Sequence, residues 1–270
     1  MMFVNGIEQA SISPADRGLN YGDGVFRTMT MQHGRVRNWA LHYRKLASDC
    51  ERLGIVCPAI DVLETDLARI AKADMACVVK IIVTRGVGGR GYGVFNQMQP
   101  GRIVSSSALP VYPPEYATEG IVARLCAIRL ARQPLLAGIK HLNRLEQVIA
   151  RNEWNDPAIA EGLLCDEPGH VIGGTMSNVF IIRDRQLYTP DLTGSGIAGV
   201  TRDRILALAS SLGLMATIAQ LDLQELLEAD EVLLCNSVIG VWQIRELHRK
   251  RWEKGLFTPL IRAGLEKEDD

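Results

Sequence analysis

Residues 137–147 have the sequence Ala-Gly-Ile-Lys-His-Leu-Asn-Arg-Leu-Glu-Gln. They place one lysine, Lys140, between a small apolar turn and a helix that the spacing predicts over 142–153. A lysine beside a helix start is ordinarily a solvated charge. Covalent chemistry would require its amine to be desolvated beside a carbonyl compound, where the unprotonated amine is a nucleophile. The local sequence leaves both interpretations open.

The composition is that of a globular protein with a large core, because 47% of the 270 residues are hydrophobic. The formal net charge is −1 and the basic residues are dispersed, which favours a small-molecule substrate over nucleic acid or an anionic membrane. No apolar run approaches the roughly 18 residues of a membrane helix, and the N-terminus lacks a signal-peptide pattern. We therefore predict a cytoplasmic protein.

The cysteines and histidines show no metal-ligand spacing, and no serine lies in a G-x-S-x-G elbow. A metal site and a serine-hydrolase site are therefore not expected. Most cysteines lie inside apolar runs, which predicts reduced core residues. They are Cys50, Cys57, Cys77, Cys126, Cys165 and Cys235.

Turn signals in the first hundred residues predict antiparallel strands. Asn5-Gly6 and His33-Gly34 each lie between short apolar runs, a pattern typical of β-hairpins. Apolar spacing predicts helices over 40–53 and 59–73, the first ending before Gly54. Two apolar runs, 77–83 and 103–109, predict buried strands.

The segment Pro110-Val-Tyr-Pro-Pro114 has no period and three prolines, which indicates a domain boundary. We expect an N-terminal domain over 1–112, a linker over 113–120 and a C-terminal domain over 121–270. The second domain should contain strands over 121–130, 161–166, 178–183 and 231–235, and helices over 201–212 and 222–228. Hairpins combined with helices predict a mixed α/β (α+β) fold.

The glycine-rich segment Thr84-Arg-Gly-Val-Gly-Gly-Arg-Gly-Tyr-Gly93 matches neither a P-loop nor a dinucleotide-binding motif. It predicts a loop. Arg85 and Arg90 could grip a carboxylate there if the loop borders a pocket. A flexible surface hairpin is the alternative.

Two further positions have both a structural and a functional interpretation. Thr201 precedes an apolar-periodic helix, so it fits an N-cap, and the free amides there would also bind an anion. Spacing favours the simple cap. Asn236-Ser237 follows an apolar strand and predicts either a turn or a polar contact at the carboxyl end of that strand.

Several stretches together resemble the fold-type IV pyridoxal-phosphate enzymes, and most closely the bacterial aminodeoxychorismate lyases among them. Their order and spacing match the family nearly end to end. They are Asp16-Arg17, Tyr21-Gly-Asp-Gly-Val-Phe26, Gly88-Gly-Arg-Gly-Tyr92, Gly138-Ile-Lys-His-Leu-Asn-Arg-Leu-Glu146, Ser177-Asn-Val-Phe180, Tyr188-Thr-Pro190, Gly199-Val-Thr-Arg-Asp203 and Ala229-Asp-Glu-Val232.

The resemblance implies a two-domain fold with pyridoxal 5'-phosphate between the lobes, usually in a homodimer. It implies Lys140 and Thr28 as catalytic residues, Lys140 being the Schiff-base lysine and the acid/base. The cofactor-binding residues would be Lys140, Lys45, Val200, Thr201, Asn236 and Ser237. The substrate-binding residues would be Tyr21, Arg90 and Tyr92, which would line the substrate pocket together with Thr28.

The activity implied by this resemblance converts 4-amino-4-deoxychorismate to 4-aminobenzoate and pyruvate, a step towards folate. Lys140 would remove a ring proton while the cofactor withdraws electrons, and loss of pyruvate would make the ring aromatic.

Two positions depart from the family pattern. Val171-Ile-Gly-Gly174 has Gly173 where the family usually has a glutamate that pairs with the cofactor's pyridine nitrogen. Lys45 replaces a phosphate-binding arginine, although Arg44 is adjacent. The departures leave two alternatives to the lyase: a non-catalytic or regulatory protein on the same fold, and a D-amino-acid or branched-chain type aminotransferase.

Overall fold

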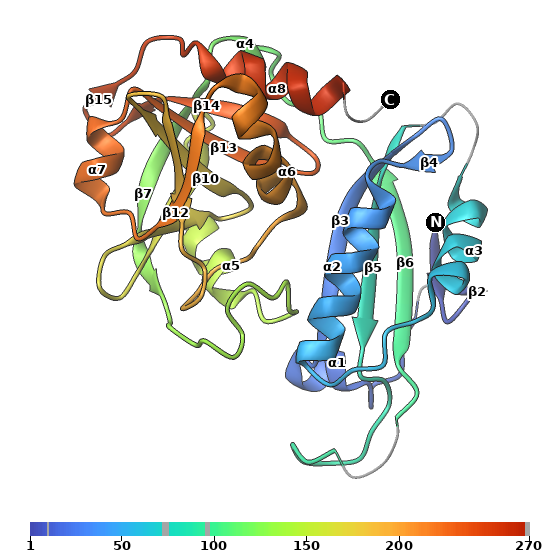
Figure 1. The fold of residues 1–270 in the computed structure, drawn as a ribbon. Coiled ribbons are helices and arrows are strands. Elements are labelled where there is room, and N and C mark those ends of the chain that lie inside the picture. The colour runs from blue at the N-terminus through green and yellow to red at the C-terminus, as the bar shows by residue number, and fades with distance from the viewer. Residues whose placement is uncertain (10, 72–75, 95–97, 268–270) are drawn as a thin grey trace. The chain divides into compact units, whose positions relative to one another are not determined.

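A computed structural model describes residues 1–9, 11–71, 76–94 and 98–267 and contains two compact units, each built on its own sheet (Figure 1). Unit 1 comprises Met1–Pro110 and Lys140–Asn143, and unit 2 comprises Val111–Ile139 and Arg144–Asp270. The predicted mixed α/β class is confirmed. The range 113–120, predicted as a linker, contains a short helix, α4 (Glu115–Thr118), and belongs to unit 2.

Unit 1 is an antiparallel sheet with the strand order β2-β1-β6-β5-β3-β4. Its strands are β1 (Met2–Val4), β2 (Ile7–Glu8), β3 (Gly24–Gln32), β4 (Arg35–Val36), β5 (Cys77–Thr84) and β6 (Gly101–Ala108). Its helices are α1 (Arg17–Tyr21), α2 (Trp39–Arg52) and α3 (Ile60–Ile70). Both predicted hairpins are confirmed. Their two-residue turns have positive φ throughout, 51° and 80° at Asn5 and Gly6 and 48° and 73° at His33 and Gly34.

Helix α2 lies along β3 in unit 1 (Figure 1). Burial alternates along β3, with Val25 and Met29 fully buried and Phe26 and Thr28 only partly so. The two faces of the strand are therefore distinct. The helix predicted over 40–53 is confirmed. The helix predicted over 59–73 ends at Ile70, and residues 72 and 73 lie outside the described ranges.

Unit 2 is a larger mixed sheet with the order β12-β11-β10-β13-β14-β7-β8-β9, to which β15 adds beside β14. Its strands are β7 (Ile121–Leu130), β8 (Ile159–Asp166), β9 (Val171–Gly174), β10 (Asn178–Arg183), β11 (Gln186–Pro190), β12 (Met215–Ala219), β13 (Glu231–Asn236), β14 (Gly240–Leu247) and β15 (Lys250–Arg251). Its other helices are α5 (Leu145–Arg151), α6 (Val200–Leu208), α7 (Leu223–Glu228) and α8 (Phe257–Lys267), with a 3-10 turn at Ala209–Leu212.

The core of unit 2 has two main parts. One is enclosed by β7, β8, β10, β13 and β14 around Trp242 and Trp252. The other is covered by α6 and α8, which pack their apolar sides on the far face of β10 and β13. In the described residues no helix is long and apolar enough to cross a bilayer.

The helix predicted over 142–153 begins later than expected, at Leu145. The reason is that Lys140–Leu142 pairs as a short antiparallel strand with the outer edge of β3. The amide of Phe26 donates to the carbonyl of Lys140 at 2.9 Å, and the amide of Leu142 donates to the carbonyl of Gly24 at 3.0 Å. A Cβ on Gly24 would lie 2.5 Å from the backbone carbonyl oxygen of Val83 on β5, so the close approach of these two strands favours glycine here.

Candidate functional site

The backbone carbonyl and the backbone amide of Lys140 are both hydrogen-bonded. Its carbonyl accepts from Phe26, and its amide donates to the Asp49 carboxylate at 3.0 Å. Its Nζ lies 4.6 Å from the centre of the Phe26 ring. The main chain therefore fixes the direction of this side chain, and the amine lies over the Phe26 ring.

The predicted catalytic residue Thr28 lies on the same face of the sheet as Phe26, two residues along β3. Its register partner on β5 is Lys80, whose Nζ lies 4.9 Å from the Phe26 ring centre. The structure therefore brings Lys140 and Thr28 to one face together with Phe26 and Lys80. Sequence reasoning missed the last two residues, although the period of β3 and its pairing with β5 would have indicated them.

Asp49 anchors this group of residues in unit 1. It is a buried residue of α2 that also pairs with the buried guanidinium of Arg27. Burial raises the pKa of the Asp49 carboxyl, whereas the Arg27 charge and the Lys140 amide oppose that rise. Since Asp49 accepts from Lys140, it couples α2 to the backbone of the lysine.

Lys45 lies one helical turn before Asp49, and its positive charge acts on that carboxyl. It is partly buried, whereas Arg44 is exposed. Of the two cations that the sequence offered as phosphate ligands, Lys45 is therefore the one on the side of α2 that carries Asp49.

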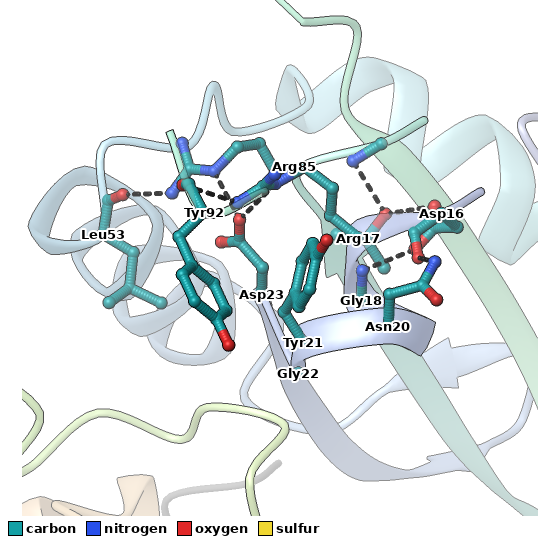
Figure 2. A network of polar contacts seen from close by, with 12 residues as sticks. Asp16, Arg17, Gly18, Asn20, Tyr21, Gly22, Asp23, Leu53, Arg85 and Tyr92 are labelled. Carbon is teal, nitrogen blue, oxygen red and sulfur yellow. Dashed lines mark hydrogen bonds and ion pairs between the residues drawn. The ribbon is translucent and has the colours of Figure 1, made fainter. Parts of the chain in front are cut away.

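The glycine-rich loop is fastened by two arginines that share one carboxylate, Asp23 (Figure 2). Arg17 and Arg85 donate to Asp23 at 2.9 and 2.8 Å. Arg17 also donates to the carbonyls of Gly91 and Tyr92, at 2.9 and 3.0 Å.

The expectation that Arg85 is available to a substrate carboxylate is wrong. Besides Asp23, it binds the carbonyls of Leu53 and Gly54, both at 2.7 Å. Its partners are distant in sequence, so spacing gave no sign of them. Arg90, in the same loop, is exposed.

Two of the predicted substrate-binding residues are in contact, Tyr21 at the end of α1 and Tyr92 in this loop. The rings of Tyr21 and Tyr92 make an edge contact with centroids 5.4 Å apart (Figure 2), and the Tyr21 hydroxyl accepts from the amide of Gly91 at 3.1 Å. Tyr92 is nevertheless 85% exposed. The segment between Arg85 and Tyr92 forms the expected loop, apart from an isolated bridge at Val87.

A second group of predicted site residues lies in unit 2, at the start of α6. The expectation that Thr201 is a simple N-cap is wrong, because the N-cap is Gly199 and Thr201 is the second helical residue. The Thr201 and Ser237 hydroxyls lie 3.2 Å apart. Asn178 fixes the approach to this helix, since it accepts from the Gly199 amide at 3.1 Å and donates to the Ile197 carbonyl at 2.7 Å. Sequence reasoning did not select Asn178.

Asn236, predicted as a cofactor-binding residue, forms the turn after β13. Its side-chain oxygen accepts from the amides of Val238 and Ile239 at 2.8 and 2.9 Å, and its amide donates to the Met176 carbonyl at 3.0 Å. This turn carries Ser237 towards Thr201. The side chain of Asn236 therefore shapes the site.

Gly173 lies on β9, next to a turn held by the buried carboxylate of Glu161. That carboxylate accepts from the amides of Thr175 and Met176 and from the Ser177 hydroxyl, at 3.1, 3.2 and 2.9 Å. A Cβ on Gly173 would lie 2.8 Å from the carbonyl oxygen of Ser177. A side chain at 173 would thus press on this turn.

The model of the family "Amino-transferase class IV" matches residues 24–247. The chain belongs to this family. The matched range contains predicted site residues from each unit, namely Thr28, Lys45, Lys140, Thr201 and Ser237.

Three relatives show which branches of the family this chain is similar to. It is 36% identical to the aminodeoxychorismate lyase of Vibrio harveyi, over 89% of each protein. It is 41% identical to the crystal structure of 4-amino-4-deoxychorismate lyase from Pseudomonas aeruginosa, with a TM-score of 0.93 over 99% of each chain. It is also 31% identical to a putative branched-chain-amino-acid aminotransferase of Methanocaldococcus jannaschii, over 89% of this chain and 84% of the relative. The fold-type IV resemblance and its fold are therefore confirmed.

The clamp around Asp23 leads to a pH-dependent prediction. Burial alone would raise the pKa of the Asp23 carboxyl, but the Arg85 and Arg17 hydrogen bonds outweigh it and hold that pKa below its ordinary value of 3.8. A lowered carboxyl pKa stabilises the fold above the unfolded pKa, and this stability is lost as the pH falls through the folded pKa. We expect Asp23→Asn to cost about 1–3 kcal/mol at pH 7 and clearly less at pH 3.

Urea unfolding of both proteins at the two pH values measures this difference. Glu51→Gln, which changes an exposed carboxyl on α2, is the matched control and should change stability by about 0.5 kcal/mol or less. An equal cost of Asp23→Asn at pH 7 and pH 3 would contradict a role for the carboxylate charge.

Proposed function

We propose that this chain is a pyridoxal-phosphate-dependent lyase that converts 4-amino-4-deoxychorismate to 4-aminobenzoate and pyruvate. The observation that carries the proposal is the placement of Lys140, whose main chain is fixed by Phe26 and Asp49 and whose amine lies on the face that carries Thr28. Similarity to two lyases at 36% and 41% identity supports this reaction over others in the family.

Each unit supplies residues whose chemistry suits one end of pyridoxal phosphate. Lys140 offers a primary amine to the aldehyde. The first turn of α6 offers the amides of Val200 and Thr201 together with the adjoining Thr201 and Ser237 hydroxyls, a donor set suited to a phosphate. Lys45 would add a positive charge. When bound, this cofactor withdraws electrons from the substrate and so lowers the cost of removing a ring proton.

The chain's own residues would position the substrate and move its protons. The Lys140 amine would act as a base beside Phe26, and its fixed main chain limits the volume that the amine can reach. Thr28 would donate or accept through its hydroxyl on the same face. Tyr21 and Tyr92 would pack on the ring of the substrate, and the exposed Arg90 would pair with one of its carboxylates. Release of pyruvate leaves an aromatic product, which drives the elimination.

Lys140→Ala tests the proposal directly. Purified wild-type protein with added pyridoxal phosphate should show the visible absorbance of lysine-bound cofactor and release 4-aminobenzoate and pyruvate in equal amounts. The variant should lose that absorbance and at least about 10³-fold in turnover, because the covalent attachment and the base are lost together. Lys254→Ala, which changes an exposed lysine, should retain both.

Other outcomes of the same assay identify the alternatives. Absorbance without either product would support a non-catalytic protein. Glutamate formed from 2-oxoglutarate and an amino donor, without 4-aminobenzoate, would support an aminotransferase. Retention of both absorbance and turnover in Lys140→Ala would exclude Lys140 from the chemistry.

Gly173 allows a test of the missing glutamate. We expect Gly173→Glu to bind pyridoxal phosphate about tenfold more tightly than Gly173→Ala, since a carboxylate would pair with the protonated pyridine nitrogen. The alanine variant is the matched control, because both side chains place a Cβ 2.8 Å from the Ser177 carbonyl. Titration of cofactor absorbance gives the two affinities. Equal affinities would show that the site does not use a carboxylate at this position.

The predicted homodimer belongs to the same proposal. Leu145, Val148 and Ile149 lie on one side of α5 and are 74%, 51% and 53% exposed. Such an apolar stripe supports a contact with a second copy. Light scattering should give twice the chain mass, and Val148→Asp should shift it towards the mass of one chain. A single-chain mass for the wild type would contradict the dimer. The cytoplasmic location stays a prediction.

A further inference from the structure

Two cysteines of unit 1 are brought together by the turn that ends α2. Cys50 lies in the last turn of the helix, and Gly54 reverses the chain with a φ of 62°. The amide of Ile55 then donates back to the carbonyl of Cys50 at 2.8 Å. The Tyr43 hydroxyl, two helical turns before Cys50 on the same side of α2, donates to the Pro58 carbonyl at 3.2 Å, so the segment that carries Cys57 lies along the side of α2 that carries Cys50. Both are free cysteines.

The two thiols have unequal environments. Cys50 is fully buried, whereas Cys57 is partly exposed. The hydrogen bond from Cys50 lowers the pKa of Cys57 and outweighs its burial, and the Tyr43 hydroxyl acts in the same direction. The same contact, together with burial, raises the pKa of Cys50. Cys57 is therefore the thiol with access to solvent and the lower pKa, and Cys50 is the buried thiol beside it.

The other four cysteines have no such arrangement. Cys77, Cys126, Cys165 and Cys235 are buried, and burial raises the pKa of each thiol, to about 12 for Cys126 and Cys235. A reactive cysteine needs thiolate character and exposure, and a reversible redox site also needs a second thiol nearby. Cys57 and Cys50 together meet all three conditions.

We propose that Cys57 and Cys50 form a reversible disulfide, with Cys57 as the thiol that reacts with a peroxide and Cys50 as the thiol that resolves the product. In the first step the Cys57 sulfur attacks one peroxide oxygen, the O–O bond breaks, and sulfenic acid and water (or an alcohol) form. In the second step the Cys50 sulfur attacks the Cys57 sulfur, the S–O bond breaks, and the hydroxyl leaves with the Cys50 proton as water. The peroxide is reduced by two electrons and the two thiols are oxidised.

This modification site adjoins the anchor of Lys140. Cys50 directly follows Asp49, whose carboxylate binds the Lys140 amide and Arg27. The disulfide would thus constrain the helical turn that holds this lysine. The proposal rests on the two thiols and not on the proposed reaction, so it can be tested without substrate.

Tryptic mapping tests the disulfide, since cleavage after Lys45, Arg52 and Arg69 puts Cys50 and Cys57 on separate peptides, 46–52 and 53–69. The full-length protein is treated with one equivalent of hydrogen peroxide, alkylated with iodoacetamide and digested. We expect the two peptides to be linked, two hydrogens lighter than their sum, and separated again by dithiothreitol. The peptides of the other four cysteines, alkylated in the same sample, are the internal control.

Two further measurements identify the roles of the thiols. In the untreated protein, iodoacetamide should alkylate Cys57 at least about tenfold faster than Cys50. In Cys50→Ser, peroxide should leave Cys57 as a sulfenic acid that dimedone captures, whereas Cys57→Ser should give neither the link nor the capture. Equal alkylation rates would overturn the assignment of Cys57. Peroxide treatment that leaves peptides 46–52 and 53–69 unlinked would overturn the disulfide.

Discussion

The pairing of Lys140–Leu142 with the outer edge of β3 is the constraint on which the candidate site depends. β4 covers β3 only at Met31 and Gln32, so the amide of Phe26 and the carbonyl of Gly24 would otherwise lack strand partners. The three-residue segment supplies them. Because paired residues of antiparallel strands point to the same face, this register places Lys140 beside Phe26 and His141 beside Val25. A shift by one residue would turn the amine to the α2 face.

Buried and partly buried carboxylates perform the rest of the positioning. Asp49 joins α2 to Lys140, Asp23 joins α1 to the glycine-rich loop through its two arginines, and Glu161 holds the turn after β9. Burying a charge is costly, and a buried ion pair is weak evidence for stability by itself. Each of these carboxylates instead collects donors from separate segments. Their common effect is to fix loops that carry candidate site residues.

The sequence predicted those features that depend on local chemistry. Asn5-Gly6 and His33-Gly34 predicted hairpins because few residues other than glycine and asparagine tolerate two consecutive positive φ angles. The helix over 40–53 followed from its apolar spacing and from Gly54. The family and the role proposed for Lys140 came instead from the ordered motifs, since the local sequence around Lys140 favoured a solvated charge.

Most of the errors arise because the deciding partner is distant in sequence. Arg85 binds Asp23, 62 residues earlier. The start of α5 was misplaced because strand pairing with β3 competes with helix formation at Leu142. Thr201 was assigned as a cap because its spacing fits one, whereas its hydroxyl lies against Ser237 on another segment.

Gly173 leaves the pyridine nitrogen of the proposed cofactor without the glutamate that usually pairs with it in this family. Glu161 is a nearby carboxylate, but its oxygens already accept from Gly162, Thr175, Met176 and Ser177, so recruiting it as a ring partner would dismantle the turn that it holds. Without a carboxylate paired to its pyridine nitrogen, the cofactor would withdraw electrons from the substrate less strongly. Such a site suits an elimination better than an amino transfer, because formation of an aromatic product supplies driving force that the cofactor would otherwise provide. The glycine at 173 is therefore compatible with the lyase and disfavours an aminotransferase.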